Sequence, residues 1–170
     1  MIVLPSSAFP QVHLAPGKLL IVSEPLSVVT LLGSCVAITM FARRLGLAAI
    51  CHAMLPAPPR RDQSSIKGET RFRYLSFAVA AMVDAYRQRG VDLDTVEAKM
   101  FGGGAVIGHS ASHTAVGCIG ESNIEVARRL LVDAHIFVCA ENVGGSVGRK
   151  IIFNTATGEV LHKQFPASAS

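Results

Sequence analysis

Residues 28–41 read VVTLLGSCVAITMF, an uncharged stretch in which a Gly-Ser-Cys turn separates two apolar runs. Short runs rich in Val, Ile and Leu that end at a glycine are typical of buried strands. Similar runs flank this stretch on both sides, bounded by Pro25 and Gly46. The sequence therefore predicts strands at Leu19–Val22, Val28–Leu32, Val36–Phe41 and Leu47–His52.

Two later segments carry apolar residues at helical spacing. The first runs from Leu75 to Tyr86, and Gly90 marks its C-terminal end. The second is predicted over Ser122–Asp133, because Ser122 and Glu125 match a capping box. The remaining predictions are a long loop at Leu55–Arg73, strands at Val96–Phe101 and Ile136–Cys139, and a hairpin of Lys150–Phe153 with Glu159–Phe165.

The composition favours one packed domain. Of 170 residues, 50% are hydrophobic and 16% are charged, which excludes a disordered chain and fits a single domain over residues 1–165. Residues 166–170 are expected to form a flexible tail. The uncharged stretch Leu26–Ala42 is shorter than the roughly 20 strongly apolar residues that a membrane helix needs, so buried strands explain it better.

The cysteines are expected to be free thiols. Residues 1–4 show neither the basic start nor the long apolar stretch of a signal peptide. We therefore expect a cytoplasmic protein, in which thiols stay reduced. The four cysteines are Cys35, Cys51, Cys118 and Cys139.

Cys35 and His52 are the candidates for chemistry, because each stands at the end of a predicted strand. The thiolate is the reactive form of cysteine, and a nearby imidazole can generate it near neutral pH. The Gly33-Ser34 turn exposes backbone N–H groups that could hold an oxyanion. We expect acyl-transfer chemistry, with Cys35 alkylated faster than Cys51, which would point to the opposite face from His52. A core cysteine and a hydrogen-bonded core histidine are the alternative reading.

A metal site would be the competing use of the histidines and cysteines. The spacing of His109, His113, Cys118, His135 and Cys139 matches no closed zinc motif. The glycine clusters at 102–104 and 144–148 have the wrong offsets for a dinucleotide fingerprint, and they predict tight turns instead. We expect neither a metal nor an organic cofactor.

The basic residues gather in the long loop. Formal net charge is +4, from 16 basic and 12 acidic residues. A solvated loop and a docking surface for an acidic protein both remain open, while nucleic acid ranks last because no recognition motif accompanies the charges. The basic residues concerned are Arg60, Arg61, Lys67, Arg71 and Arg73.

A series of short blocks, in this order, resembles the CheD family of chemoreceptor glutamine deamidases. The resemblance runs from about Val28 to Lys163, and the order of the blocks is more specific than Gly-Ser-Cys alone. The blocks are TLLGSCV at 30–36, HAMLP at 52–56, KMFGG at 99–103, IGESNI at 119–124 and GRKIIFN at 148–154.

The resemblance implies both a fold and a reaction. The fold would be α/β, a single-domain α/β sandwich of mixed sheet layers flanked by two main helices, similar to the catalytic domain of cytotoxic necrotizing factor toxins. Cys35 would be the nucleophile, His52 the base and Thr30 the third catalytic residue. The enzyme would be a hydrolase of the side-chain amide of protein glutamine, with receptor methyl-ester hydrolysis by the same route.

The implied partners are the cytoplasmic helices of methyl-accepting chemotaxis receptors and, in some members, a CheC-type phosphatase. Arg60, Arg61, Arg71 and Arg73 could grip such a helix. A non-catalytic adaptor that binds a receptor or a signalling phosphatase is the alternative function, and a His/Cys metal-binding module is another.

Overall fold

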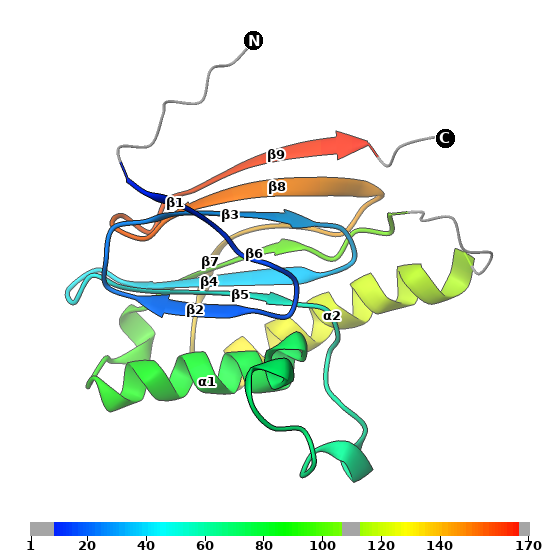
Figure 1. Ribbon diagram of the computed structural model, residues 1–170, viewed down its shortest axis with the longest axis horizontal. Helices are drawn as coiled ribbons and strands as arrows, with labels where there is room; N and C mark the ends of the chain where they lie inside the picture. The colour runs from blue at the N-terminus through cyan, green and yellow to red at the C-terminus, as the bar shows by residue number, and fades with distance from the viewer. Residues whose placement is uncertain (1–8, 107–112, 167–170) are drawn as a thin grey trace.

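The computed structural model describes residues 9–106 and 113–166, and the side chains in all of these except 113–118. A four-stranded sheet lies over a five-stranded sheet, and two helices cover the other face of the five-stranded sheet (Figure 1). The four-stranded sheet has the order β1 (Gln11–His13), β3 (Ser27–Leu32), β8 (Val147–Asn154), β9 (Val160–Pro166). The five-stranded sheet has the order β2 (Leu19–Val22), β5 (Leu47–Ala53), β4 (Val36–Ala42), β6 (Glu97–Gly102), β7 (Val138–Val143).

The main helices are α1 (Leu75–Gln88) and α2 (His113–Asp133). Short 3-10 helices lie at Arg60–Asp62, Glu69–Arg73 and Leu93–Thr95. Both sheets are mixed, since β1 pairs with β3 and β6 pairs with β7 in parallel, while the other pairs are antiparallel. This is the layered α/β fold with two main helices that the sequence predicts.

The fold has one core between the two sheets and another between the five-stranded sheet and the helices. Alternate residues of β4 enter opposite cores: Ala37 and Phe41 lie between the sheets, and Ile38 and Met40 lie under the helices. A strand buried on both faces needs apolar residues at every position. This explains why residues 36–41 are apolar except for the buried Thr39.

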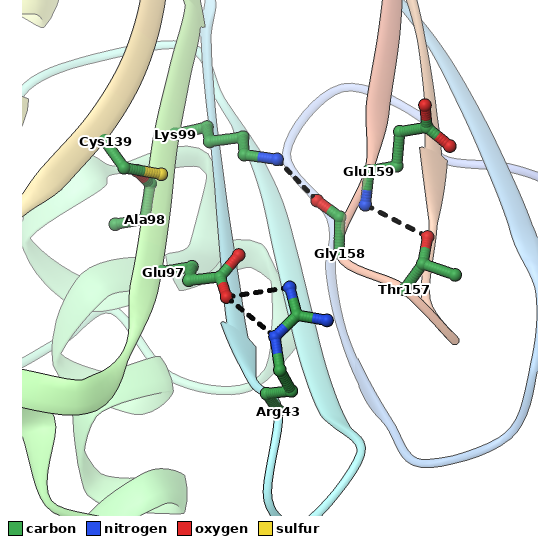
Figure 2. Close-up of polar contacts among 8 residues, drawn as sticks. All are labelled: Arg43, Glu97, Ala98, Lys99, Cys139, Thr157, Gly158 and Glu159. Atoms are coloured by element: carbon green, nitrogen blue, oxygen red, sulfur yellow. Dashed lines mark hydrogen bonds and ion pairs between the residues drawn. The ribbon is translucent and has the colours of Figure 1, made fainter.

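Several polar contacts join the two sheets, and one of them comes from Lys99. Lys99 Nζ on β6 donates a hydrogen bond of 2.7 Å to the carbonyl of Gly158 in the turn between β8 and β9 (Figure 2). Gly158 has a φ of +77°, and a Cβ there would lie 2.5 Å from the Phe41 ring. The turn therefore needs glycine at this position.

The predicted strands 19–22, 28–32, 36–41, 47–52 and 96–101, the first helix and the C-terminal hairpin are confirmed. The long loop is also found, with two of the 3-10 helices inside it. Strand β1 was not predicted, because its three residues include the exposed Gln11 and His13. Pro166 is the last residue of β9, and the rest of the expected tail lies outside the described residues.

The predicted start of the second helix is wrong. Helix α2 begins at His113, so the capping-box pattern at Ser122–Glu125 lies inside it. Gly120 also lies inside α2 and serves close packing, since a Cβ there would lie 2.6 Å from the Gly103 carbonyl oxygen.

The predicted strand Ile136–Cys139 begins too early, because β7 starts at Val138. His135 adopts a φ of 57° at the end of α2. The Ile136 N–H then donates 2.9 Å to Leu131 O, and the buried Ile136 side chain closes the helix end. Within residues 9–106 and 113–166, no helix is long and apolar enough to cross a membrane.

Candidate active site

Cys35 lies in the turn between β3 and β4, just before the first residue of β4. Its carbonyl accepts a 2.8 Å hydrogen bond from Gly103 N, and the Gly33 carbonyl accepts one of the same length from Gly104 N. Gly102 has a φ of +105°, and a Cβ there would lie 2.1 Å from the Cys35 carbonyl oxygen. The glycine cluster at 102–104 is therefore a tight backbone packing that holds the Cys35 turn.

The same turn has two N–H groups that its backbone contacts do not use. The carbonyls of Gly33, Ser34 and Cys35 are all hydrogen-bonded. Among the described residues, the backbone hydrogen bonds of turns and loops give no partner to the N–H groups of Gly33 and Ser34, while the Cys35 N–H interacts with its own thiol. Unpaired backbone donors beside a nucleophile are the usual components of an oxyanion hole.

His52 lies on β5 with its side chain in the core between the sheets. It pairs with Ala37 across β4 and is only 1% exposed. Thr30 on β3 faces it from the other sheet, with Oγ1 2.7 Å from His52 Nδ1. The structure therefore brings Thr30 and His52 together across the two sheets.

The Thr30 hydroxyl determines which His52 nitrogen carries the proton. Thr30 Oγ1 donates a 2.7 Å hydrogen bond to Leu14 O, and a hydroxyl has only one hydrogen to donate. Thr30 Oγ1 can then only accept from His52, so Nδ1 carries the hydrogen. The lone pair of the neutral ring is left on Nε2, which is the form that a general base requires.

Cys35 and His52 lie on the same side of the five-stranded sheet. Cys35 stands two positions before Ala37, the cross-strand partner of His52, and it packs against the core between the sheets. Such diagonal neighbours have Cα atoms about 7–8 Å apart, within reach of long side chains. Among the described contacts, no hydrogen bond joins Cys35 Sγ to His52, so the two lie in one compartment without being directly bonded.

Burial shifts both ionisations away from the charged forms. It lowers the pKa of His52 to about 4, an effect that the Leu14 backbone partly offsets. It also raises the pKa of Cys35, which favours the neutral thiol. The resting site therefore holds a neutral thiol and a neutral imidazole.

The other cysteines are placed differently. Cys51 is fully buried under the helices, where burial raises its pKa to about 11, so its prediction as a core residue is confirmed. Cys139 is exposed on β7, beside Ala98 (Figure 2). No group of three metal-binding side chains occurs among the described residues. The proposed metal candidates His109, His113 and Cys118 lie outside the described side chains.

Two buried polar residues near the turn were missed in the sequence. Asn123 on α2 donates 3.0 Å hydrogen bonds to the carbonyls of Ser34 and Met54. Arg149 on β8 is 2% exposed, and burial lowers its pKa. Its guanidinium donates to Asn142 Oδ1 at 2.6 Å and to Gly144 O at 2.7 Å. The sequence could have pointed to them only because they lie in two of the blocks that carry the family resemblance, residues 119–124 and 148–154.

The basic loop adjoins the end of β5. The carbonyl of Arg73 accepts hydrogen bonds from Met54 N at 2.8 Å and Leu55 N at 3.0 Å. In Figure 1 the loop leaves β5 and extends to the helix side of the molecule, toward α1. The arginines of this loop, Arg60, Arg61, Arg71 and Arg73, are all exposed.

A cavity of about 500 Å³ lies at the other end of the sheet, between the β4–β5 turn and the end of α1. Its lining includes Arg43, which pairs with Glu97 at 2.9 Å (Figure 2). The lining contains neither a cysteine nor a histidine. The candidate active site is therefore the Cys35 turn with His52 and Thr30.

A family model and two similar curated proteins all point to the same family. The family model described as CheD chemotactic sensory transduction matches residues 54–164. The "Probable chemoreceptor glutamine deamidase CheD 2" of Geobacter sulfurreducens is 40% identical over 155 residues, covering 91% of this chain and 90% of that protein. The "Probable chemoreceptor glutamine deamidase CheD" of Oleidesulfovibrio alaskensis is 38% identical over 156 residues, covering 91% of this chain and 72% of that protein.

Among solved structures, the hypothetical protein YfiH of Bacillus licheniformis matches with a TM-score of 0.46 and 19% identity, over 76% of this chain and 50% of that one. The family match begins two residues after His52. The matched range therefore includes none of Thr30, Cys35 and His52.

Proposed function

The chain belongs to the CheD family, and we propose that it converts specific glutamines of chemotaxis receptors to glutamate with release of ammonia. One observation carries the mechanism: the Leu14–Thr30–His52 chain of hydrogen bonds leaves Nε2 of a neutral imidazole unprotonated, in the compartment that holds Cys35. The substrate would be the cytoplasmic helices of the receptor, which implies a cytoplasmic enzyme.

The reaction would proceed through a thioester. His52 Nε2 takes the proton of Cys35 Sγ, and the thiolate attacks the side-chain carbonyl carbon of the glutamine. The N–H groups of the Gly33–Cys35 turn stabilise the oxyanion of the tetrahedral intermediate. His52 returns the proton to the leaving nitrogen, and ammonia departs.

Hydrolysis would complete the cycle. His52 takes a proton from water, the hydroxide attacks the thioester carbon, and Cys35 leaves as the thiol once it regains that proton. The product is glutamate. A glutamate methyl ester would enter the same route, with methanol leaving in place of ammonia, so we propose methyl-ester hydrolysis as a second activity.

The test is incubation of the purified protein with a receptor cytoplasmic fragment, followed by peptide mass spectrometry. We expect Gln-to-Glu conversion at particular positions, together with ammonia release. If the folded protein binds the receptor fragment or a CheC-type phosphatase but converts no glutamine, it acts as an adaptor and the proposal is wrong.

Thr30→Val removes the hydroxyl while keeping the shape of the side chain. Nδ1 of His52 then loses its acceptor, so the ring is held in neither the correct tautomer nor the correct orientation. We expect kcat to fall roughly tenfold to a hundredfold, less than for loss of a triad carboxylate because a hydroxyl carries no charge. Thr30→Ser, which keeps the hydroxyl, should retain most activity. Ammonia release by Thr30→Val at the rate of the unmodified protein would show that Thr30 has no role in catalysis.

Replacing the loop arginines Arg60, Arg61, Arg71 and Arg73 with Ser tests whether this surface docks the receptor. Their side chains are exposed. Such charges act mainly on association rate and are screened by salt. We expect kcat/KM on the receptor fragment to fall roughly threefold to tenfold at low salt, with a flatter salt dependence.

A matched control replaces exposed arginines elsewhere with Ser and makes the same change in net charge. We expect this variant to keep its kcat/KM. Equal losses in both variants would indicate a general charge effect rather than a docking surface. The control residues are Arg44, Arg87, Arg89 and Arg129.

A further inference from the structure

Asn123 spans the two segments that carry the nucleophile and the base. Its Nδ2 donates 3.0 Å hydrogen bonds to the carbonyl of Ser34, which precedes Cys35, and to the carbonyl of Met54, two residues after His52. Since an amide nitrogen has two hydrogens, these bonds use its full donor capacity. A single side chain therefore ties the β3–β4 turn to the end of β5.

The amide orientation follows from its partners. Reversing it would place Oδ1 against two carbonyl oxygens, which have no hydrogen to donate. In the orientation that satisfies both carbonyls, Oδ1 is fully buried and has no hydrogen-bond partner among the described residues. An unpaired buried acceptor costs about 1–3 kcal/mol. Stability alone therefore does not account for asparagine at this position.

Helix α2 presents Asn123 rigidly. The adjacent Ile124 is part of the core under the helices, as are Ala127 and Leu131 one and two turns further along the helix. Near the same point, Gly120 packs on Gly103, whose N–H bonds the Cys35 carbonyl. The helix thus reaches the Cys35 turn by two routes, one through Asn123 and one through Gly103.

We propose that Asn123 is a positioning residue, which fixes the distance between Cys35 and His52 by holding Ser34 and Met54 on one amide. The inference rests on the proposed function where it is tested by kcat on the receptor fragment. It does not rest on that function where it is tested by alkylation of Cys35. Proton transfer from the thiol to the imidazole is efficient only when the two groups are held at the right distance and angle. A misplacement of about 1 Å can lower the rate of the catalysed reaction about a hundredfold.

The test uses Asn123→Leu, which removes both donors without adding charge, and Asn123→Asp, which removes both donors and keeps the shape. In the folded variants we expect kcat on the receptor fragment to fall about tenfold to a hundredfold, while KM stays within about twofold. A fall confined to Asn123→Asp would indicate a charge effect and would overturn the proposal.

The control is Thr155→Val. Thr155 is also a buried polar residue that bridges backbone segments, since its hydroxyl contacts Leu26 N at 2.7 Å and Glu24 O at 2.6 Å. It directly follows β8 and contacts the segment that leads into β3, at the opposite end of β3 from Cys35. We expect a similar loss of thermal stability with unchanged kcat. If kcat falls in Thr155→Val as much as in Asn123→Leu, the effect is only structural.

A second readout needs no receptor. We expect the pH profile of Cys35 alkylation by iodoacetamide in Asn123→Leu to shift toward that of His52→Gln, because the thiol and the imidazole are no longer held together. An unchanged profile would overturn the proposal. If the unmodified protein releases no ammonia, the proposed function fails, and this readout still decides the role of Asn123.

Discussion

Cys35→Ala is expected to reduce ammonia release from a receptor fragment to the background rate. The variant lacks the atom that forms the thioester, and loss of a catalytic nucleophile costs at least about a thousandfold in kcat. The fold should survive, because Cys35 is only half-buried in a turn held by backbone hydrogen bonds. Peptide mass spectrometry would follow glutamine conversion, and thermal unfolding would confirm that the variant is folded.

Cys51→Ala is the matched control. Cys51 is fully buried in the core under the helices, so its truncation should lower the free energy of unfolding by roughly 1–2 kcal/mol through a small cavity. Its side chain points away from the site, and the activity of the folded protein should be kept. Conversion near the unmodified rate by a folded Cys35→Ala protein would rule out the thioester route.

The strands could be predicted because buried strands consist of short local runs of apolar residues. β4 is buried on both faces, and its apolar run marks both ends within a residue. Cys35 and His52 were found for the same reason, since each stands at the end of such a run. The start of α2 was misplaced because Ser122 and Glu125 match a capping box locally, although both lie inside the helix.

The rest of the site depends on contacts between distant segments. Thr30 and His52 belong to different sheets, so no strand register relates them, and Thr30 came only from the family resemblance. Asn123 and Arg149 contact mainly backbone carbonyls. Every residue has a backbone carbonyl, so residue types do not indicate which carbonyls these side chains will bind. Burial also raises the pKa of Cys35, and the local sequence does not show how deeply this thiol is buried.

His52→Gln tests the base. General-base catalysis contributes about a hundredfold to ten-thousandfold, and we expect kcat/KM at neutral pH to fall about a thousandfold within that range. The pH profiles should also differ in shape. With His52 present, the rate should be nearly flat above about pH 5.5, because the imidazole has lost its proton. In His52→Gln only the spontaneously ionised thiol can attack, so the rate should climb through neutral and alkaline pH toward the raised pKa of Cys35.

The same residue should also make the fold sensitive to acid. The pKa of His52 falls from 6.5 when unfolded to about 4 when folded, so the unfolded chain binds more protons between these values and stability rises with pH there. His52 thus contributes stability that is fully present above pH 6.5 and is lost as pH falls through 4. The amount is on the order of 3 kcal/mol.

Urea unfolding at pH 7 and pH 4.5 should show most of this difference, and His52→Gln should remove it. Equal losses of stability on acidification in His52→Gln and in the unmodified protein would mean that folding does not lower the pKa of His52. The assignment of a neutral imidazole that resists protonation would then be wrong.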